Sequence, residues 1–371
     1  MDDAFKDLLR ALKQAPVMGA IHPLVPLCLP GEVTVLKDAG TVVMAMDDPA
    51  PHSEHPVLIS TLDHRYKDRF ITWNHADCPS PELINRALPK RHTDARRLLL
   101  THRQVADRIV DDVRHRGYQA VALLLIDGLS YDDTLSWPER PEPCFIDGPT
   151  ITYSQLPDET IASDVGFPGI VGTPPLFRRL TDLGLQRARG YSYWGREEDV
   201  SAVLFQGIPL TKVDSTSKAF AELADMDLSG MYIQLVREGL DGLAHRRREL
   251  TPEEIQTTAK AIHRDFTRLV EVLAASECRG AVYLIADHGI LWKRQHAFSL
   301  VEGPRSQSSR YSLNRPSSPG VTSRFRMQHQ TYYLYHFPYL GRRIASNDSG
   351  VHGGLSYWES IVPFVHVEVN V

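Results

Sequence analysis

The run AVALLLID, residues 120–127, is the stretch that decides the fold. Seven consecutive apolar residues end in an aspartate, which is typical of a parallel strand that is covered on both faces. Two later segments repeat this plan, since MYIQLV ends at Val236 and GAVYLIAD ends at Asp287. We therefore expect an α/β domain with a mostly parallel central sheet.

The segment between the second and third runs predicts a long amphipathic helix. Thr251 and Glu254 have the spacing of a capping box, and Pro252 occupies the first helical position. The expected buried stripe consists of Ile255, Ala259, Ile262, Phe266, Leu269 and Leu273. Because strand, helix and strand follow one another, we expect a right-handed crossover between parallel strands.

Composition indicates a folded globular protein and narrows the possible partners. The 371 residues are 42% hydrophobic and carry a net charge of −5, so no global basic field exists to attract nucleic acid. The first residues lack the apolar core of a signal peptide, and no apolar run has the length of a membrane span. The four cysteines are far apart, which favours free thiols over a disulfide framework. These features predict a cytoplasmic protein without a membrane partner.

The first 90 residues differ in character from the rest. Residues 20–90 are rich in proline and histidine and contain the short strand-like runs EVTVL, TVVMAM and PVLIS. We expect a small β-containing N-terminal unit over residues 1–90 and a catalytic domain over residues 91–371.

Possible metal ligands follow each of the three apolar runs. They are Asp127, then Asp241 and His245, then Asp287 and His288, and a further histidine, His352, occurs in GVHGGLS. Singly each has a simpler explanation, such as an Asp-Gly turn, a surface pair at helical spacing or a loop histidine. Together, three aspartates and three histidines suffice for two sites of mixed oxygen and nitrogen ligands. Such ligands favour zinc, or alternatively manganese, over magnesium alone.

From Asp127 to its C-terminus, the chain resembles the alkaline phosphatase superfamily. Within it, IDGLSYDD, ADHG and HGGLSYWESIVPFV are similar to the signature blocks of the PglZ domain of bacterial phage-defence and signalling proteins. The resemblance implies a three-layer sandwich with two divalent metals. It implies one metal on Asp127, Asp287 and His288, and the other on Asp241, His245 and His352. Two residues depart from the resembling patterns: Ser130 stands where many PglZ domains carry an arginine, and Phe167 stands where the nucleophile block of cofactor-independent phosphoglycerate mutases has a histidine.

The superfamily needs a hydroxyl nucleophile, and LPDETIASDVGFPGIVG offers two. Ser163 begins SDVGFPGI, which is similar to the nucleophile block of cofactor-independent phosphoglycerate mutases. Thr160 resembles the threonine of a PTxT pattern that many PglZ domains carry. We favour Ser163, because Gly166 three residues later permits a close approach to a metal. Alternatively, either hydroxyl only caps the following helix.

The segment Gly303–Arg326 contains five arginines and no acidic residue. It is expected to be a solvated loop or, alternatively, a mobile arm in which Arg310 and Arg315 bind the phosphates of a substrate.

The ligand pattern and the resemblance together predict a two-metal phosphodiesterase that acts on nucleotides or nucleic acid, and the resemblance implies protein partners in a phage-defence or signalling system. Two alternatives belong to other classes: a non-catalytic scaffold or sensor in such a system, and a phosphomutase. All six ligands are present, which a scaffold does not need. The interval from Ser163 to Asp241 is too short for the large cap domain of a mutase.

Overall fold

The computed structural model describes residues 22–28, 33–38, 41–46, 70–71, 78–150, 166–194, 204–245, 250–301, 306, 308–327 and 330–370. The chain divides into two compact units, Met1–Leu98 and Leu99–Val371. The boundary expected near residue 90 lies inside helix α3 (Pro81–Leu98), which belongs to the first unit. None of the helices in the described part is both long and apolar enough to cross a membrane.

The first unit contains a small antiparallel sheet. Strand β2 (Thr41–Met46) pairs with β1 (Val33–Asp38) and with β3 (Phe70–Ile71), so two of the three strand-like runs form strands. The third run, PVLIS, lies outside the described residues. The unit also has the helical turn α2 (Val25–Cys28). Helix α3 is kinked at Arg91, two residues after Pro89. Proline has no backbone N–H, so one hydrogen bond of the helix is missing there.

The second unit is built on an eight-stranded sheet with the order β4-β6-β18-β10-β5-β9-β7-β8. The strands are β4 (Leu100–Thr101), β5 (Ala120–Asp127), β6 (Glu142–Phe145), β7 (Arg187–Tyr193), β8 (Leu210–Lys212), β9 (Met231–Glu238), β10 (Gly280–Ala286) and β18 (Ile361–Val369). All pairs in this sheet are parallel except those that β18 makes with β10 and β6. The mostly parallel sheet expected from the three apolar runs is therefore confirmed.

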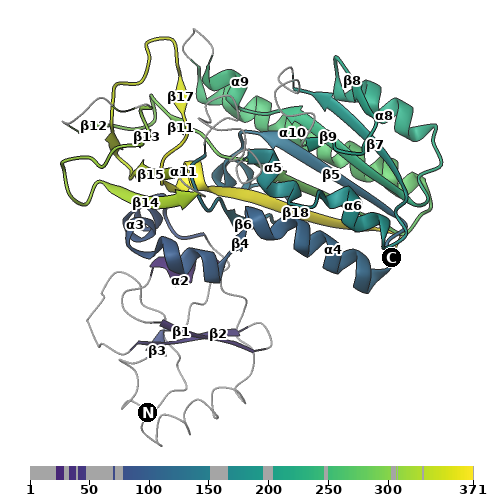
Figure 1. Cartoon of the computed structure of the whole chain (residues 1–371), viewed down its shortest axis with the longest axis horizontal. Coiled ribbons are helices and arrows are strands. Elements are labelled where there is room, and N and C mark those ends of the chain that lie inside the picture. The colour runs from purple at the N-terminus through teal and green to yellow at the C-terminus, as the bar shows by residue number, and fades with distance from the viewer. Residues whose placement is uncertain are drawn as a thin grey trace, which may run out of the picture. The chain divides into compact units, whose positions relative to one another are not determined.

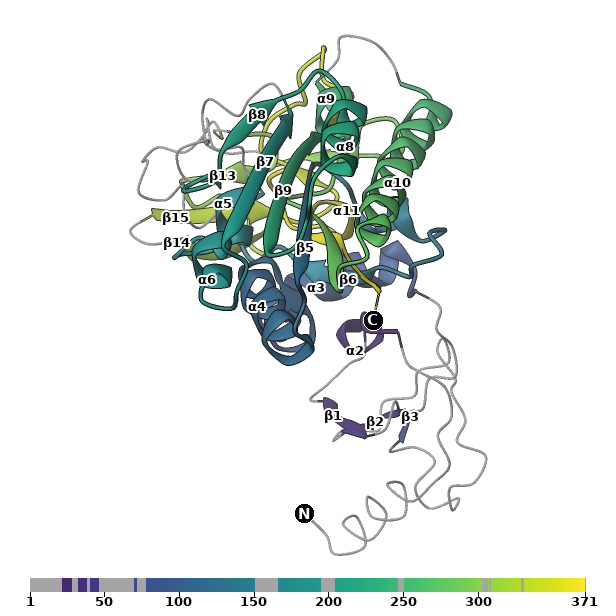
Figure 2. The ribbon, with the colours of Figure 1, turned by 90° about the vertical axis from the view of Figure 1, so that its right-hand side faces the viewer.

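Helices cover both faces of this sheet (Figures 1 and 2). Helices α4 (Val105–Arg116), α5 (Gly166–Val171) and α6 (Leu176–Thr181) lie on connections that run from β4 to β5 and from β6 to β7. Helices α8 (Thr216–Ala224) and α10 (Pro252–Ala275) lie on connections that run the opposite way along the sheet. Right-handed crossovers in opposite directions place their helices on opposite faces, which gives the expected three layers.

Helix α10 and the central strands follow from the sequence. Thr251 accepts a hydrogen bond from the Glu254 amide and Glu254 accepts one from the Thr251 amide, so the capping box is confirmed. Every residue of the expected stripe is buried. Strand β5 is buried along its whole length, because helices cover it on both faces. The four cysteines are free thiols, as expected.

In its described part, the arginine-rich segment contains two strands and a mostly exposed connection over residues 313–320, so a solvated loop accounts for only part of it. Strands β13 (Tyr311–Ser312) and β14 (Thr322–Met327) pair antiparallel with β15 (Gln330–Tyr335) in a small separate sheet. Burial alternates along β14: Phe325 is buried, whereas Arg324 and Arg326 are exposed. Apolar and charged residues alternate along this strand, which is the pattern of a half-buried strand. The number of arginines drew attention away from that alternation.

Candidate metal centre

The first five candidate ligands come from the carboxyl ends of three adjacent strands. Asp127 is the last residue of β5, and Asp287 and His288 directly follow β10. Asp241 begins the short helix α9 (Asp241–Ala244) just after β9, and His245 follows that helix. Because β9, β5 and β10 are parallel neighbours, their carboxyl ends meet at one edge of the sheet.

The sixth candidate, His352, arrives from a distant part of the chain. It follows β17 (Gly350–Val351), which pairs with β11 (Leu291–Trp292) just after the β10 ligands. Its Nε2 atom lies 3.5 Å from Asp241 Oδ1, and its ring stacks on that of His288 with centroids 3.9 Å apart. The chain thus folds back onto the site, as the ligand assignment required.

Five of the six residues form two overlapping groups with ligand-like spacing. Within each group, one nitrogen or oxygen atom of every residue lies within 4.8 Å of the others; the groups are Asp127, Asp287 and His288, and Asp241, His288 and His352. His245 stands at the side of the second group, with Nε2 3.3 Å from Asp241 Oδ1. The grouping differs from the expected one in that His288 belongs to both groups.

The distances between ligand atoms suit a shared cation. His288 Nε2 lies 3.6 Å from Asp127 Oδ1 and 3.7 Å from Asp287 Oδ1. Two ligands on a tetrahedral zinc ion, each about 2.0–2.2 Å from the metal, are separated by about 3.3–3.6 Å. The two atoms Asp127 Oδ1 and His288 Nε2 are buried and have no hydrogen-bond partner among the residues that the structure describes. Burying an oxygen and a nitrogen without hydrogen bonds lowers the stability of the fold unless a cation binds them. The residues therefore fit a metal ion.

The charges at the site also demand a cation. Three carboxylates are buried together, with exposed fractions of 2% for Asp127, 0% for Asp241 and 8% for Asp287. Burial, assisted by the nearby charge of Asp127, raises the pKa of Asp287. Burial lowers the pKa of His288, but the surrounding carboxylates outweigh it and raise that pKa above its ordinary value. In contrast, burial and the neighbouring His288 lower the pKa of His352 to about 4, which keeps it neutral and able to bind a metal.

Further residues hold the ligands in orientation. His352 Nδ1 bonds to the Thr150 carbonyl, and His245 Nδ1 lies 3.2 Å from Asp348 Oδ1. Because a carbonyl or carboxylate oxygen can only accept a hydrogen bond, each Nδ1 donates there, and Nε2, which lies near Asp241 Oδ1, is the nitrogen left to bind a cation. The Trp194 indole donates to Asp127 Oδ2, and Phe167 packs edge-on against that indole at 5.2 Å. These orienting residues were not found from the sequence, because a main-chain carbonyl or a lone tryptophan has no motif.

Close packing explains the residue types at positions 128 and 130, which lie near the ligands. Gly128 has φ +81, and a Cβ atom there would lie 2.9 Å from the Asp241 amide nitrogen, so glycine is required between the ligands. Ser130 is buried, donates to the Trp358 carbonyl and accepts from the Ile290 amide. It therefore braces the ligand loops where the resembling family carries an arginine.

The other predicted site residues have different outcomes. Ser163 and Thr160 lie outside the described residues. Arg315 is exposed. Arg310 is fully buried and forms a two-point ion pair with Glu359, so its guanidinium cannot bind a substrate phosphate. The expectation that Arg310 contacts substrate is therefore wrong: it assumed an exposed segment, and the partner carboxylate comes from a distant part of the chain.

No protein-family model and no curated protein matches this chain. Among solved structures, it is similar to murine ectonucleotide pyrophosphatase/phosphodiesterase 5, with 13% identity and a TM-score of 0.45 over 66% of this chain and 87% of that one. An inactive form of that protein in complex with AMP is 12% identical, with a TM-score of 0.44 over 66% of this chain and 87% of that one. The zinc complex of the C-terminal periplasmic domain of EptC from Escherichia coli is 14% identical, with a TM-score of 0.29 over 47% of this chain and 65% of that one. Such low scores carry no statement about activity.

Proposed function

We propose that this chain is a metal-dependent phosphoester hydrolase of the alkaline phosphatase superfamily, and that phosphodiesters are its substrates. The observation that carries the proposal is the convergence of three aspartates and three histidines at the carboxyl edge of one parallel sheet. A buried cluster of this composition is costly to fold without cations, and mixed oxygen and nitrogen ligands favour zinc or manganese.

The two groups would provide for two divalent cations, and His288, which belongs to both groups, could bind one of them through its free Nε2. Asp127 and Asp287 would serve the first, and Asp241, His352 and His245 the second. Bound there, the cations would supply Lewis-acid stabilisation of the phosphoryl oxygens and lower the pKa of the attacking hydroxyl. All other catalytic roles at this site belong to residues of the chain itself.

We propose Ser163 as the nucleophile and Thr160 as the alternative. The position that a Cβ atom on Gly166 would occupy lies 3.8 Å from Asp287 Oδ2, so the chain passes beside the first group at that residue. Three residues span at most about 10 Å, which keeps Ser163 within reach of the site. Its oxygen would attack phosphorus and displace one ester oxygen, which leaves as an alcohol with the serine proton. Water would then cleave the bond between the serine oxygen and phosphorus, which releases a phosphate monoester and restores the serine hydroxyl.

Within the superfamily, we propose a PglZ-like protein that acts on nucleotides or oligonucleotides in a phage-defence or signalling system. The signature-like blocks around Asp127, Asp287 and His352 support this proposal. Of the rival functions, a phosphomutase is disfavoured. The described residues between Gly166 and Asp241 belong to the main sheet, its helices and their connections, and leave residues 195–203 as the one undescribed stretch. That stretch is too short for a cap domain.

A metal-dependent assay tests the proposal. We expect protein loaded with zinc or manganese to hydrolyse bis-p-nitrophenyl phosphate faster than p-nitrophenyl phosphate. A chelator should abolish the activity, and the metal should restore it. Binding of both metals without hydrolysis of either compound or of oligonucleotides would favour the scaffold or sensor function instead. Faster hydrolysis of the monoester would contradict the choice of diesters.

A further inference from the structure

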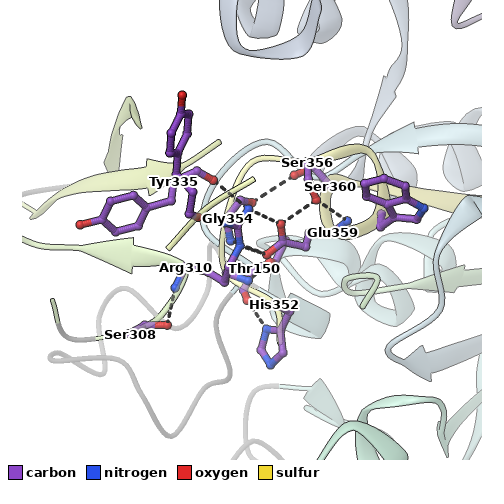
Figure 3. Close-up of polar contacts among 12 residues, drawn as sticks. Thr150, Ser308, Arg310, Tyr335, His352, Gly354, Ser356, Glu359 and Ser360 are labelled. Carbon is purple, nitrogen blue, oxygen red and sulfur yellow. Dashed lines mark hydrogen bonds and ion pairs between the residues drawn. The ribbon is translucent and has the colours of Figure 1, made fainter. Parts of the chain in front are cut away.

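The turn that carries His352 is fixed by hydrogen bonds at consecutive residues (Figure 3). His352 Nδ1 bonds to the Thr150 carbonyl, and the Gly353 amide donates to Thr150 Oγ1 at 2.6 Å. Gly353 has φ +113, which only glycine adopts readily, so this tight turn is specified by sequence. The next amide, that of Gly354, donates to Glu359 Oε1 at 2.9 Å.

Glu359 is fully buried and accepts hydrogen bonds from three different residues. Besides the Gly354 amide, Ser356 Oγ donates to Oε2 at 2.6 Å. Arg310 donates from Nε to Oε1 at 2.9 Å and from Nη2 to Oε2 at 2.7 Å. A buried carboxylate keeps such an arrangement only when a cation compensates its charge, and Arg310 supplies that cation.

Arg310 is itself held rigidly. Its side chain has an exposed fraction of 0%, and it also donates to the carbonyl oxygens of Tyr335 and Tyr339. The guanidinium packs directly on the turn, because a Cβ atom added to Gly354 would lie 2.5 Å from Arg310 Nη2 and 2.7 Å from Cζ. Figure 3 shows Arg310, Gly354 and Glu359 together, with His352 and Thr150 beside them.

We propose that Arg310 is a positioning residue for the metal centre, which holds His352 in place through Glu359 and the Gly354 amide. The inference rests on the proposed function in one respect, namely that His352 is a metal ligand. Metal bonds tolerate displacements of only about 0.2 Å. Without its planar two-point partner, Glu359 would no longer fix the Gly354 amide, and His352, two residues away, would shift relative to Asp241.

The test is zinc titration of the full-length protein in which Arg310→Lys is compared with Arg187→Lys. Lysine keeps the charge but cannot donate two parallel hydrogen bonds to one carboxylate. Arg187 is the control, because it also pairs with an aspartate, Asp227, but lies far from the ligands. It is the first residue of β7, at the edge of the sheet opposite to the ligands. We expect Arg310→Lys to weaken one of the two zinc sites by about 10–100-fold, the usual effect of losing a residue that orients a ligand. The other site and the control should be unchanged.

A folded Arg310→Lys protein with both zinc affinities intact would overturn the inference. If that variant does not fold, Ser356→Ala decides, since it removes the hydrogen bond to Glu359 Oε2 together with the one that Ser356 Oγ accepts from the Glu359 amide. A selective loss at one site would again support the inference, and two unchanged affinities would overturn it. Failure of the metal assignment is distinguishable, because the unaltered protein would then bind no zinc, and failure of the hydrolase activity alone would leave these zinc affinities as predicted.

Discussion

His288→Ala should lose one metal and weaken the other, because His288 Nε2 can bind one cation and its ring packs against His352, a proposed ligand of the second. Its Nε2 atom lies 3.6 Å from Asp127 Oδ1 and 3.7 Å from Asp287 Oδ1, and its ring stacks on His352. We expect less than one metal ion per chain by elemental analysis. The rate of diester hydrolysis should fall by about 10³-fold or more, since the stabilisation of charge by metals contributes several kcal/mol to such reactions.

The matched control for this variant is His115→Ala. His115 is exposed near the end of α4, and within the described part of the chain its ring bonds to the Asp111 carbonyl of the same helix. This control should keep its metal content and its turnover. A His288→Ala protein that retains two metals and normal turnover would contradict the assignment of this residue.

Ser163→Ala should abolish turnover and leave the metal content intact. The serine oxygen is proposed to form the bond to phosphorus, so its removal leaves the ligands in place but takes away the nucleophile. We expect kcat to fall by about 10³-fold or more, as for other enzymes that lose a nucleophile. Thr160→Ala serves as the control and should remain active.

The two variants together identify the nucleophile. An active Ser163→Ala protein beside an inactive Thr160→Ala protein would transfer the role to Thr160. Activity of both variants would show that neither hydroxyl attacks phosphorus, and a water molecule would then be the nucleophile.

The central strands and their acidic ends could be predicted from sequence because the signals are local. An apolar run such as residues 120–127 specifies a doubly covered strand, and the residue that ends it lies at the carboxyl edge of a parallel sheet. Helix α10 was predictable for the same reason, since its cap and its buried stripe both lie within the helix. The position of β18 between β6 and β10 has no such local signal.

Arg310 shows where local reasoning fails. Its segment has no acidic residue, so the charge pattern indicated an exposed basic surface. The compensating carboxylate, Glu359, lies 49 residues further along the chain, and burial of the pair depends on tertiary structure. Trp194 and Thr150 were missed for a related reason, because they orient ligands through an indole nitrogen and main-chain or hydroxyl oxygen atoms. Such contacts leave no spacing rule in the sequence.

The most direct test of the account is the metal content of the unaltered protein, purified without chelator and measured by elemental analysis. The account predicts about two zinc or manganese ions per chain, in keeping with the two ligand groups that share His288. Less than half an equivalent, with no binding when zinc or manganese is titrated in, would contradict the claim that these six residues form a metal centre.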